Sequence, residues 1–235
     1  MRSSSNDIYV NGDYFRNNPE WGVKDAAWKS DVIYQLLEKN ALHPVEVIEV
    51  GCGSGAILES LSASMPATSF RGYDISPHAI NLAHTRSNER IHFFNEDFTQ
   101  VEYLQTDLIM VIDVLEHVDN YYDMLRHLKS KARNFIFHIP LDLSCRTILK
   151  PHILLQQRTS VGHIHYFSKE MVEWMLKDTG FEIIDWVYTK PVVDVNPPDS
   201  FKRRCKKILR NLSFSLDKNM SAKLWGSYSM MILAK

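Results

Sequence analysis

One segment constrains the fold more than any other: residues 47–55 read VIEVGCGSG, an apolar run that ends in three closely spaced glycines. The run has the length and the Val and Ile content of a strand buried on both faces. Glycine at its end lets the backbone turn tightly and approach a ligand, and a helix starting at Ala56 would offer free backbone amides to an anionic group. The segment therefore predicts a strand, a ligand-binding turn and a helix in direct succession.

Strand-like and helix-like segments alternate from about residue 45 to residue 140, which predicts βαβ units in a largely parallel sheet with helices on both faces. The expected strands are Val45–Val50, Ser69–Tyr73, Ile91–Phe94, Leu108–Val114 and Phe135–Ile139, followed by Phe181–Tyr188 and Gly226–Ala234. The expected helices are Ala26–Lys39, Ala56–Ser64, Pro77–Arg86, Asn120–Lys129 and Ser168–Asp178.

A chain of 235 residues of this composition is expected to form a single α/β domain. Its predicted parts are an N-terminal cap (1–43), a cofactor-binding core (44–140), a connector or lid (141–167) and a C-terminal part of the sheet (168–235) with a basic insertion (190–225). The cysteines form no CxxC pair, no signal-peptide pattern opens the chain, and no apolar run reaches the roughly 20 residues of a membrane helix. We therefore expect a cytoplasmic protein without stable membrane insertion.

Charge is informative only locally. Lys and Arg (27) balance Asp and Glu (28), which argues against nucleic acid as a partner. Six basic side chains nevertheless gather at residues 202–210. They form either a solvated helix face or a surface for an anionic acceptor, a carrier-bound substrate or a nearby membrane.

Acidic residues narrow the choice of cofactor. Gly51, Gly53 and Ala56 also satisfy a dinucleotide-binding pattern. Asp74 ends the second strand, where a carboxylate can accept hydrogen bonds from both ribose hydroxyls. Dinucleotide cofactors and other adenosine-containing cofactors share this feature. Asp97 follows the third strand and suits an adenine amino group, whereas Glu49 would repel a pyrophosphate and favours a cationic ligand, such as a sulfonium that carries an ammonium group.

These motifs resemble the class I S-adenosylmethionine-dependent methyltransferases, and within them the small-molecule group that looks like the ubiquinone-biosynthesis methyltransferases. The resemblance rests on EVGCGSG (49–55), YDIS (73–76), NEDF (95–98) and DVLEHV (113–118), with GHIHYFS (162–168) also similar. It implies a Rossmann-like seven-stranded sheet with an antiparallel last strand, S-adenosylmethionine as cofactor and S-adenosylhomocysteine as product.

The same resemblance assigns the parts of the cofactor to residues. It puts the methionine part against Glu49, Gly51 and Gly53, the ribose on Asp74, and the adenine beside Ile75, Asp97 and Phe98. Asp113 is expected at the edge of the cleft. The full predicted cofactor site is Glu49, Gly51, Cys52, Gly53, Gly55, Asp74, Ile75, Asp97, Phe98, Asp113 and Val114.

Methyl transfer to a hydroxyl needs alignment, exclusion of water and a base. The candidate bases are His117, at the expected start of the helix after the fourth strand, and His163 and His165, which would face the same side of an extended segment; His138 and Glu116 rank lower. An HxH pair is also a pattern that can bind a metal ion. The spacing of residues in the sequence places no third ligand beside it, so no metal is predicted. The candidate substrate-binding residues are Tyr14, Trp21, Trp28, His138 and Tyr166.

The sequence thus predicts a methyltransferase of a small molecule, such as a natural-product scaffold or a sugar, with oxygen favoured over nitrogen or carbon. The NPPD tetrapeptide (196–199) is interpreted as a loop, because the related base-methylation motif acts from the end of the fourth strand. A nicotinamide-dependent oxidoreductase would share Gly51–Gly55 and Asp74 but would not need Glu49 or Asp97. A non-catalytic cofactor-binding protein is the other alternative, and the oligomeric state is left open.

Overall fold

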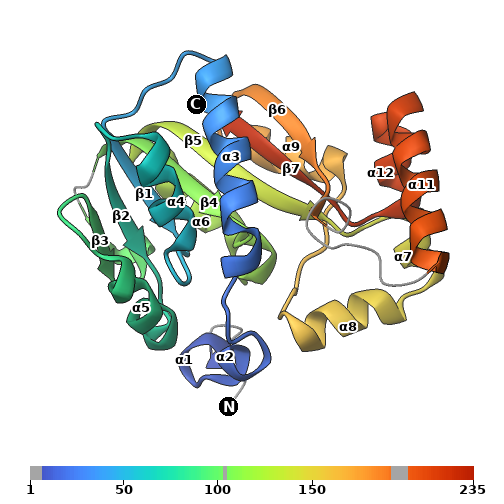
Figure 1. Ribbon diagram of the computed structural model, residues 1–235, viewed down its shortest axis with the longest axis horizontal. Coiled ribbons are helices and arrows are strands. Elements are labelled where there is room, and N and C mark those ends of the chain that lie inside the picture. Colours follow the sequence, from blue (N-terminus) through green and yellow to red (C-terminus); the bar gives the residue numbers. More distant parts are fainter. Residues whose placement is uncertain (1–6, 103–104, 192–200) are drawn as a thin grey trace.

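The fold is described here from a computed structural model, which covers residues 7–102, 105–191 and 201–235 (Figure 1). The strands are β1 (Glu46–Val50), β2 (Ser69–Tyr73), β3 (Ile91–Phe94), β4 (Thr106–Ile112), β5 (Ala132–Leu141), β6 (Ile183–Thr189) and β7 (Tyr228–Ala234). The α-helices are α1 (Asp7–Val10), α2 (Asp13–Asn17), α3 (Val23–Lys39), α4 (Ala56–Ser64), α5 (Pro77–Ala83), α6 (Tyr121–Lys129), α7 (Cys145–Leu149), α8 (His152–Ser160), α9 (Lys169–Asp178), α11 (Phe201–Leu216) and α12 (Lys218–Trp225). Short 3₁₀ turns are η1 (His84–Arg86), η2 (Phe98–Gln100) and η3 (Leu115–His117).

The seven strands form one sheet in the order β3-β2-β1-β4-β5-β7-β6. Strands β1 to β5 pair in parallel, and β7 runs antiparallel to both of its neighbours, β5 and β6. This arrangement confirms the predicted Rossmann-like sheet with an antiparallel last strand. The NPPD segment at 196–199 lies outside the described residues.

Helices cover both faces of the sheet, as the continuous apolar strands require. On one face, α3, α4 and α5 bury side chains such as Ile33, Leu58 and Ile80 against the strands. On the other face, α6 and α9 do the same with Leu125 and Val172 (Figure 1). The two apolar layers hold the central strands rigid, so that the loops at their carboxyl ends start from fixed points.

Helix boundaries follow local chemistry that the sequence already contains. The Ser76 hydroxyl accepts a hydrogen bond from the Ala79 amide at the start of α5, next to Pro77 in the first turn. Ser168 caps α9 in the same way. These caps fix where each helix begins after its strand or connector.

Three regions differ from the prediction in detail. The segment before α3, for which no element was predicted, forms two short helices, α1 and α2, and the 141–167 connector contains α7 and α8. The fourth strand ends at Ile112, because Asp113 has a φ of +52°, which is incompatible with an extended strand backbone. His117 accordingly lies in the η3 turn and not at the start of a helix, which corrects the predicted position.

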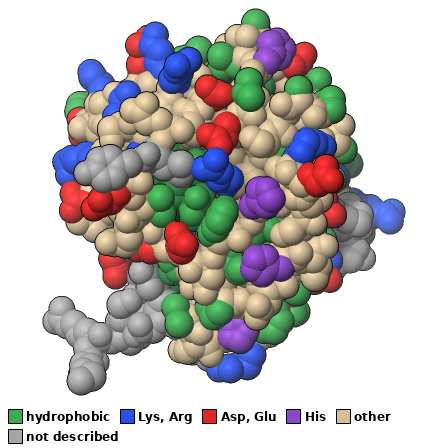
Figure 2. Space-filling view, turned by 90° about the vertical axis from the view of Figure 1, so that its left-hand side faces the viewer, with side chains coloured by type: hydrophobic (Ala, Val, Ile, Leu, Met, Phe, Trp, Pro, Cys, Tyr) green, Lys and Arg blue, Asp and Glu red, His purple; other side chains and the backbone are tan. Residues whose placement is uncertain are grey.

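Charged side chains of both signs are interspersed on the face beside β3 and α5 (Figure 2). This distribution agrees with the near-neutral composition of the chain. Within the part of the chain that the structure describes, no helix combines the length and apolarity needed to cross a membrane.

Candidate active site

The site lies where the carboxyl ends of β1 and β4 meet at the centre of the sheet, the point at which the strand order reverses. Open α/β sheets bind ligands at such switch points. Two cavities of about 510 and 410 Å³ open there. They share walls from Tyr14, Trp21, Gly51, Asp113 and His117, so a molecule in one cavity can contact a molecule in the other.

The glycine turn between β1 and α4 forms part of both walls. Gly51 has a φ of +75°, and a Cβ atom there would lie 2.5 Å from the Val114 side chain. At Gly53, with a φ of +54°, a Cβ would meet the Trp21 indole at the same distance. Gly55 lies in neither wall: a Cβ there would meet the Phe93 ring at 2.3 Å, so this glycine serves helix–strand packing.

Asp74 is buried at the end of β2 and braces the glycine turn. One carboxylate oxygen accepts from the Gly53 amide at 2.9 Å and the other from the Ser76 amide at 2.8 Å. Burial raises the pKa of Asp74 above its ordinary value, and the two amides oppose that rise. Each oxygen keeps a second lone pair, which can accept a hydrogen bond from a hydroxyl group of a ligand in the larger cavity.

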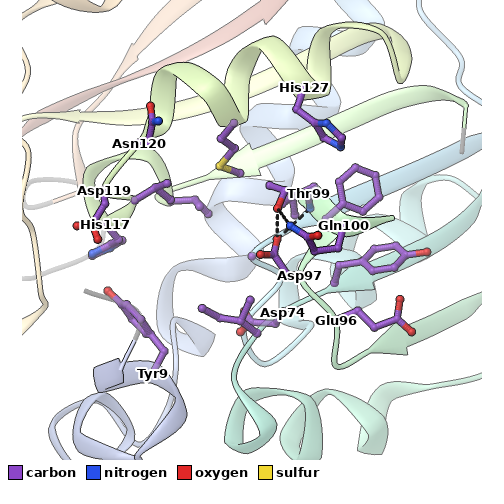
Figure 3. Close-up of a pocket in the computed structure, with 18 of the residues that line it drawn as sticks. Tyr9, Asp74, Glu96, Asp97, Thr99, Gln100, His117, Asp119, Asn120 and His127 are labelled. Atoms are coloured by element: carbon purple, nitrogen blue, oxygen red, sulfur yellow. Dashed lines mark hydrogen bonds between the residues drawn. The ribbon is translucent and has the colours of Figure 1, made fainter. Parts of the chain in front are cut away.

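Asp97 lines the larger cavity (Figure 3), as do Ile75 and Phe98. One oxygen of Asp97 caps the η2 turn, accepting from the Thr99 amide at 2.9 Å and the Thr99 hydroxyl at 2.7 Å. Phe98 is buried against Tyr73, with ring centroids 4.9 Å apart. The exposed Asp97 carboxylate and this aromatic floor together suit a flat, amino-bearing ring.

Glu49 is a buried carboxylate at the mouth of the turn. Its exposed fraction is 1%, and its Oε2 atom is buried without a hydrogen-bond partner among the described residues. Burial raises the pKa of Glu49 to about 8, although nearby Lys29 lowers it. Glu49 lines the smaller cavity with Cys52 and Gly53, and its unpaired oxygen can accept a cationic donor.

Asp113 is held by Lys29, which the sequence did not single out, and by His138, which it did. Its carboxylate lies 2.7 Å from Lys29 Nζ and 2.6 Å from His138 Nδ1. Burial alone would raise the pKa of Asp113, but His138 and Lys29 hold it far below its ordinary value. Lys29 also pairs with Asp25 at 2.9 Å, and His138 Nε2 contacts the Thr189 hydroxyl at 2.8 Å. Asp113 is therefore fixed in place, at a left-handed backbone conformation that its short polar side chain tolerates.

Lys29 could have been recognised in the sequence. It lies on the stripe of α3 formed by Ala26, Ile33, Leu36 and Leu37, all of which are buried. A lysine on such a stripe needs an acidic partner in the core. The partner's identity follows only from the fold.

The three candidate histidines differ in whether they line the cavities. His117 lines both cavities, and His163 lines the smaller one. His165 lies in neither wall; its Nε2 atom contacts the Val118 carbonyl at 3.0 Å and its ring packs against Tyr121. The predicted common direction of His163 and His165 is thus wrong, because residues 161–167 do not form a regular strand.

His117 and His163 face each other, with ring centroids 4.9 Å apart. Burial, and to a smaller extent His163, lowers the pKa of His117 to about 4, so its ring is neutral near neutral pH. Glu116 lies between them, fully buried. His138, the further candidate, has both ring nitrogens engaged by Asp113 and Thr189.

Aromatic residues before α3 close the site. Tyr14 and Trp21 line both cavities, with ring centroids 4.8 Å apart, and Tyr9, which the sequence did not single out, lines the larger cavity opposite His117 (Figure 3). Burial raises the pKa of Tyr14 to about 12, so its hydroxyl stays protonated. Neither Trp28 nor Tyr166 contributes to the walls; the Tyr166 hydroxyl donates to the Leu154 carbonyl at 2.8 Å.

The basic segment 202–210 is not uniform. Arg210, its last residue, is buried; its Nη2 atom donates to the Gly226 carbonyl at 2.6 Å and its guanidinium lies over the Tyr228 ring. Lys206 lies on the exposed part of α11. Its pKa is lowered by Arg146 on α7, by burial and by Lys150. Arg210 thus stabilises the turn that leads into β7. Lys206 instead belongs to a positive surface that α11 shares with α7.

Comparison with known proteins gives a consistent result. A family profile described as "Methyltransferase domain" matches residues 24–185. A malonyl-acyl carrier protein O-methyltransferase of Bacillus anthracis is 26% identical over 99 residues, which cover 42% of this chain and 35% of that protein. A ubiquinone biosynthesis O-methyltransferase of Rickettsia canadensis is 25% identical over 170 residues, which cover 61% of this chain and 65% of that protein. The chain thus spans less than two thirds of either relative.

Among solved structures, the fold resembles that of magnesium protoporphyrin IX methyltransferase from Synechocystis PCC 6803 with bound S-adenosylhomocysteine. The TM-score is 0.60 at 19% identity, and the match covers 88% of this chain and 82% of that one. At this identity the likeness establishes the fold alone.

Proposed function

Because the chain belongs to the methyltransferase domain family, within the class I S-adenosylmethionine-dependent enzymes, we propose that it methylates an oxygen atom of a small molecule bound in the smaller cavity. The observation that carries this proposal is the shared wall of the two cavities. One cavity has the groups that suit a nucleoside, and the other combines the glycine turn with a polar wall of imidazole and carboxyl groups.

The residues present fit the cofactor. The unpaired Oε2 atom of Glu49 would take the ammonium group, and Gly51 and Gly53, which line the same cavity, would lie along the amino-acid part. Asp74 would accept the ribose hydroxyls with its remaining lone pairs, and Asp97, beside Ile75 and Phe98, would accept the adenine amino group. When bound, S-adenosylmethionine supplies an activated methyl group on a sulfonium.

The chain's own contribution is to orient the acceptor and keep water out. Tyr14 and Trp21 cover the junction of the cavities, and the fixed Asp113 carboxylate shapes its floor. An acceptor hydroxyl in the smaller cavity would lie against the wall formed by Glu116, His117 and His163, where the neutral His117 imidazole would take its proton. A wall of this polarity favours a hydroxyl or carboxyl acceptor over an apolar carbon.

An anionic or carrier-bound form of the acceptor is favoured by a separate observation. Lys206 on α11 and Arg146 and Lys150 at α7 form a positive surface, on which Arg146 and Lys150 lie close enough to lower the pKa of Lys206. The Bacillus anthracis relative carries the name of an enzyme that acts on a carrier-protein substrate. A carrier protein with an acidic face would be attracted to this surface.

Methyl transfer from isotope-labelled S-adenosylmethionine tests the proposal. The purified protein is offered matched acceptors, free and carrier-bound, that differ only in a hydroxyl, carboxyl or amino group, and the labelled carbon is assigned by NMR. We expect label on oxygen. Label on nitrogen or carbon would overturn the O-methylation assignment, and tight NADH binding without S-adenosylhomocysteine binding would overturn the cofactor assignment.

A further inference from the structure

Glu116 is the most unusual group in the site. It is fully buried, yet neither carboxylate oxygen has a hydrogen-bond partner among the residues that the structure describes. A carboxyl group in that position is costly unless a ligand or ion completes its contacts. The carboxylate faces the smaller cavity, in the wall between His117 and His163.

Two imidazole nitrogens point at this carboxylate. His117 Nε2 lies 3.9 Å and His163 Nε2 4.0 Å from Glu116 Oε1, and the three ligand atoms all lie within 4.8 Å of one another. These separations are too long for hydrogen bonds. Ligands about 2.1 Å from a tetrahedral metal ion lie roughly 3.4 Å apart, so small side-chain rotations would bring all three into coordination range.

The opposite nitrogen of each ring is already held. His163 Nδ1 lies 2.8 Å from Asp142 Oδ2, and the other oxygen of Asp142 accepts from Gln157 at 2.7 Å. His117 Nδ1 lies 3.2 Å from the Gly162 carbonyl. A carboxylate or carbonyl on Nδ1 fixes the tautomer that leaves Nε2 free to ligate, which is the outer-shell pattern of metal-binding histidines.

The backbone keeps the two segments in register. The Glu116 carbonyl accepts from the Ile164 amide at 2.9 Å and from the His165 amide at 3.1 Å. The η3 turn and the 162–165 segment are therefore tied together beside the cluster. His163 is placed opposite Glu116 by these bonds, although 47 positions separate residues 116 and 163 in the chain.

We propose that Glu116, His117 and His163 bind one divalent transition-metal ion, with its open coordination positions facing the smaller cavity. Two imidazoles and one carboxylate suit Zn²⁺, Fe²⁺ or Co²⁺, and are a poor set for Ca²⁺ or Mg²⁺, which prefer oxygen ligands. The sequence analysis predicted no metal because spacing placed no third ligand beside the HxH pair; the proposed site uses only His163 of that pair, together with His117 and Glu116 from the η3 turn.

The role of such an ion rests on the proposed function. An acceptor oxygen that occupies an open position would lose its proton more readily, since a bound cation stabilises the alkoxide or phenoxide. The hydroxyl proton would leave to solvent as the acceptor binds, before water is excluded, and the methyl carbon would then bond to that oxygen as its bond to sulfur breaks. The two histidines act as ligands in this case and not as bases.

Metal binding can be tested without any methyl acceptor. Untagged protein is stripped with a chelator and titrated with Co²⁺, followed by its visible absorption, and with Zn²⁺ by equilibrium dialysis and elemental analysis. We expect one ion per chain. Glu116→Gln and His163→Gln should each weaken binding on the order of 100-fold or more, and Asp142→Asn by about 10- to 100-fold through the orientation of His163.

His165→Gln is the matched control, because it changes the other histidine of the same motif and its ring lies outside both cavities. It should retain the wild-type affinity. Calorimetric titration with S-adenosylhomocysteine shows that each variant is folded. Absence of metal binding in the wild type, retained affinity in Glu116→Gln or His163→Gln, or its loss in His165→Gln would each overturn the proposal. A protein that binds the ion but transfers no methyl group would instead contradict the proposed function.

Discussion

The buried Lys29 is expected to contribute more to folding than any surface charge on the same helix. Its side chain is 9% exposed and lies between Asp25, at 2.9 Å, and Asp113, at 2.7 Å. Lys29→Met keeps an unbranched chain of similar length and removes only the charged end. The variant leaves two carboxylates without their shared cation.

The magnitude follows from burial. Removing one member of a buried ion pair costs about 3–5 kcal/mol, since the remaining charge is left uncompensated. Here Asp113 keeps His138, and the Asp25 and Asp113 side chains are 25% and 29% exposed, so the lower end applies. We expect a loss of about 3 kcal/mol in unfolding free energy, which corresponds to a fall of roughly 6–12 °C in Tm for a chain of this size.

The sign of the pH dependence can be stated. The Asp113 and Asp25 carboxylates raise the pKa of Lys29 despite its burial, so its contribution is complete below the ordinary lysine pKa and is lost only at higher pH. The pKa of Asp113 is lowered, so its contribution is complete above about pH 4 and is lost as the pH falls further. The difference between wild type and Lys29→Met should thus stay constant from about pH 6 to pH 7 and widen as the pH rises through 8, because Lys29 lowers the pKa of Glu49 and its removal raises the cost of ionising that carboxyl.

Urea unfolding monitored by circular dichroism measures the effect. Lys24→Met is the matched control, since Lys24 lies on the same helix, is 79% exposed and pairs with Glu20 across one turn. Its loss should be at most about 0.5 kcal/mol. In a double-mutant cycle, Asp113→Asn should cost less in the Lys29→Met background than alone. Equal stabilities of the two lysine variants, or strict additivity in the cycle, would refute the reasoning.

Three further predictions concern the cofactor side of the site. The pKa of Glu49 is about 8, so the affinity for S-adenosylhomocysteine, measured by calorimetry, should rise from about pH 6.5 to pH 8.5 as this carboxyl ionises; the rise should vanish in Glu49→Gln, and an unchanged slope would contradict the ammonium assignment. Gly51→Ala should lower the unfolding free energy by about 2 kcal/mol through its positive φ and its contact with Val114, and Val114→Ala should restore part of that loss in urea unfolding; no restoration would show that the contact is unimportant. Asp74→Asn should weaken S-adenosylhomocysteine binding at least about 10-fold, because an amide offers one acceptor atom to two backbone amides; an unchanged Kd would exclude Asp74 from the site.

The positions of the residues proposed to bind the cofactor could largely be predicted from the sequence, because each depends on a local feature. Each strand end carries its own polar residue, and parallel strands bring those ends to one edge of the sheet. Glu49, Asp74 and Asp97 therefore lie around the same crevice as soon as the strand order is known. Gly55 is the exception, since the Phe93 ring that requires it comes from another strand.

The acceptor side could not be predicted in the same way. Lys29 reaches Asp113 from a helix that precedes the sheet, and His163 reaches Glu116 from a connector that follows it. Spacing in the chain carries no information about such pairs, because irregular segments place them. For the same reason, the two-residue spacing of His163 and His165 wrongly predicted that both side chains face the same side. That prediction requires a strand, and their segment is not one.

The two sides nevertheless meet at one contact, which limits how independently they can vary. The Trp21 indole rests on Gly53, where a Cβ would lie 2.5 Å away, and the Ser54 hydroxyl donates to the Trp21 carbonyl at 3.1 Å. The N-terminal cap thus sits directly on the cofactor turn. A side chain at position 53 would displace the tryptophan that closes both cavities, even if the turn itself tolerated the strain. The requirement for glycine there consequently arises from the acceptor side as much as from the cofactor, and a change in the cap is expected to alter cofactor affinity together with acceptor choice.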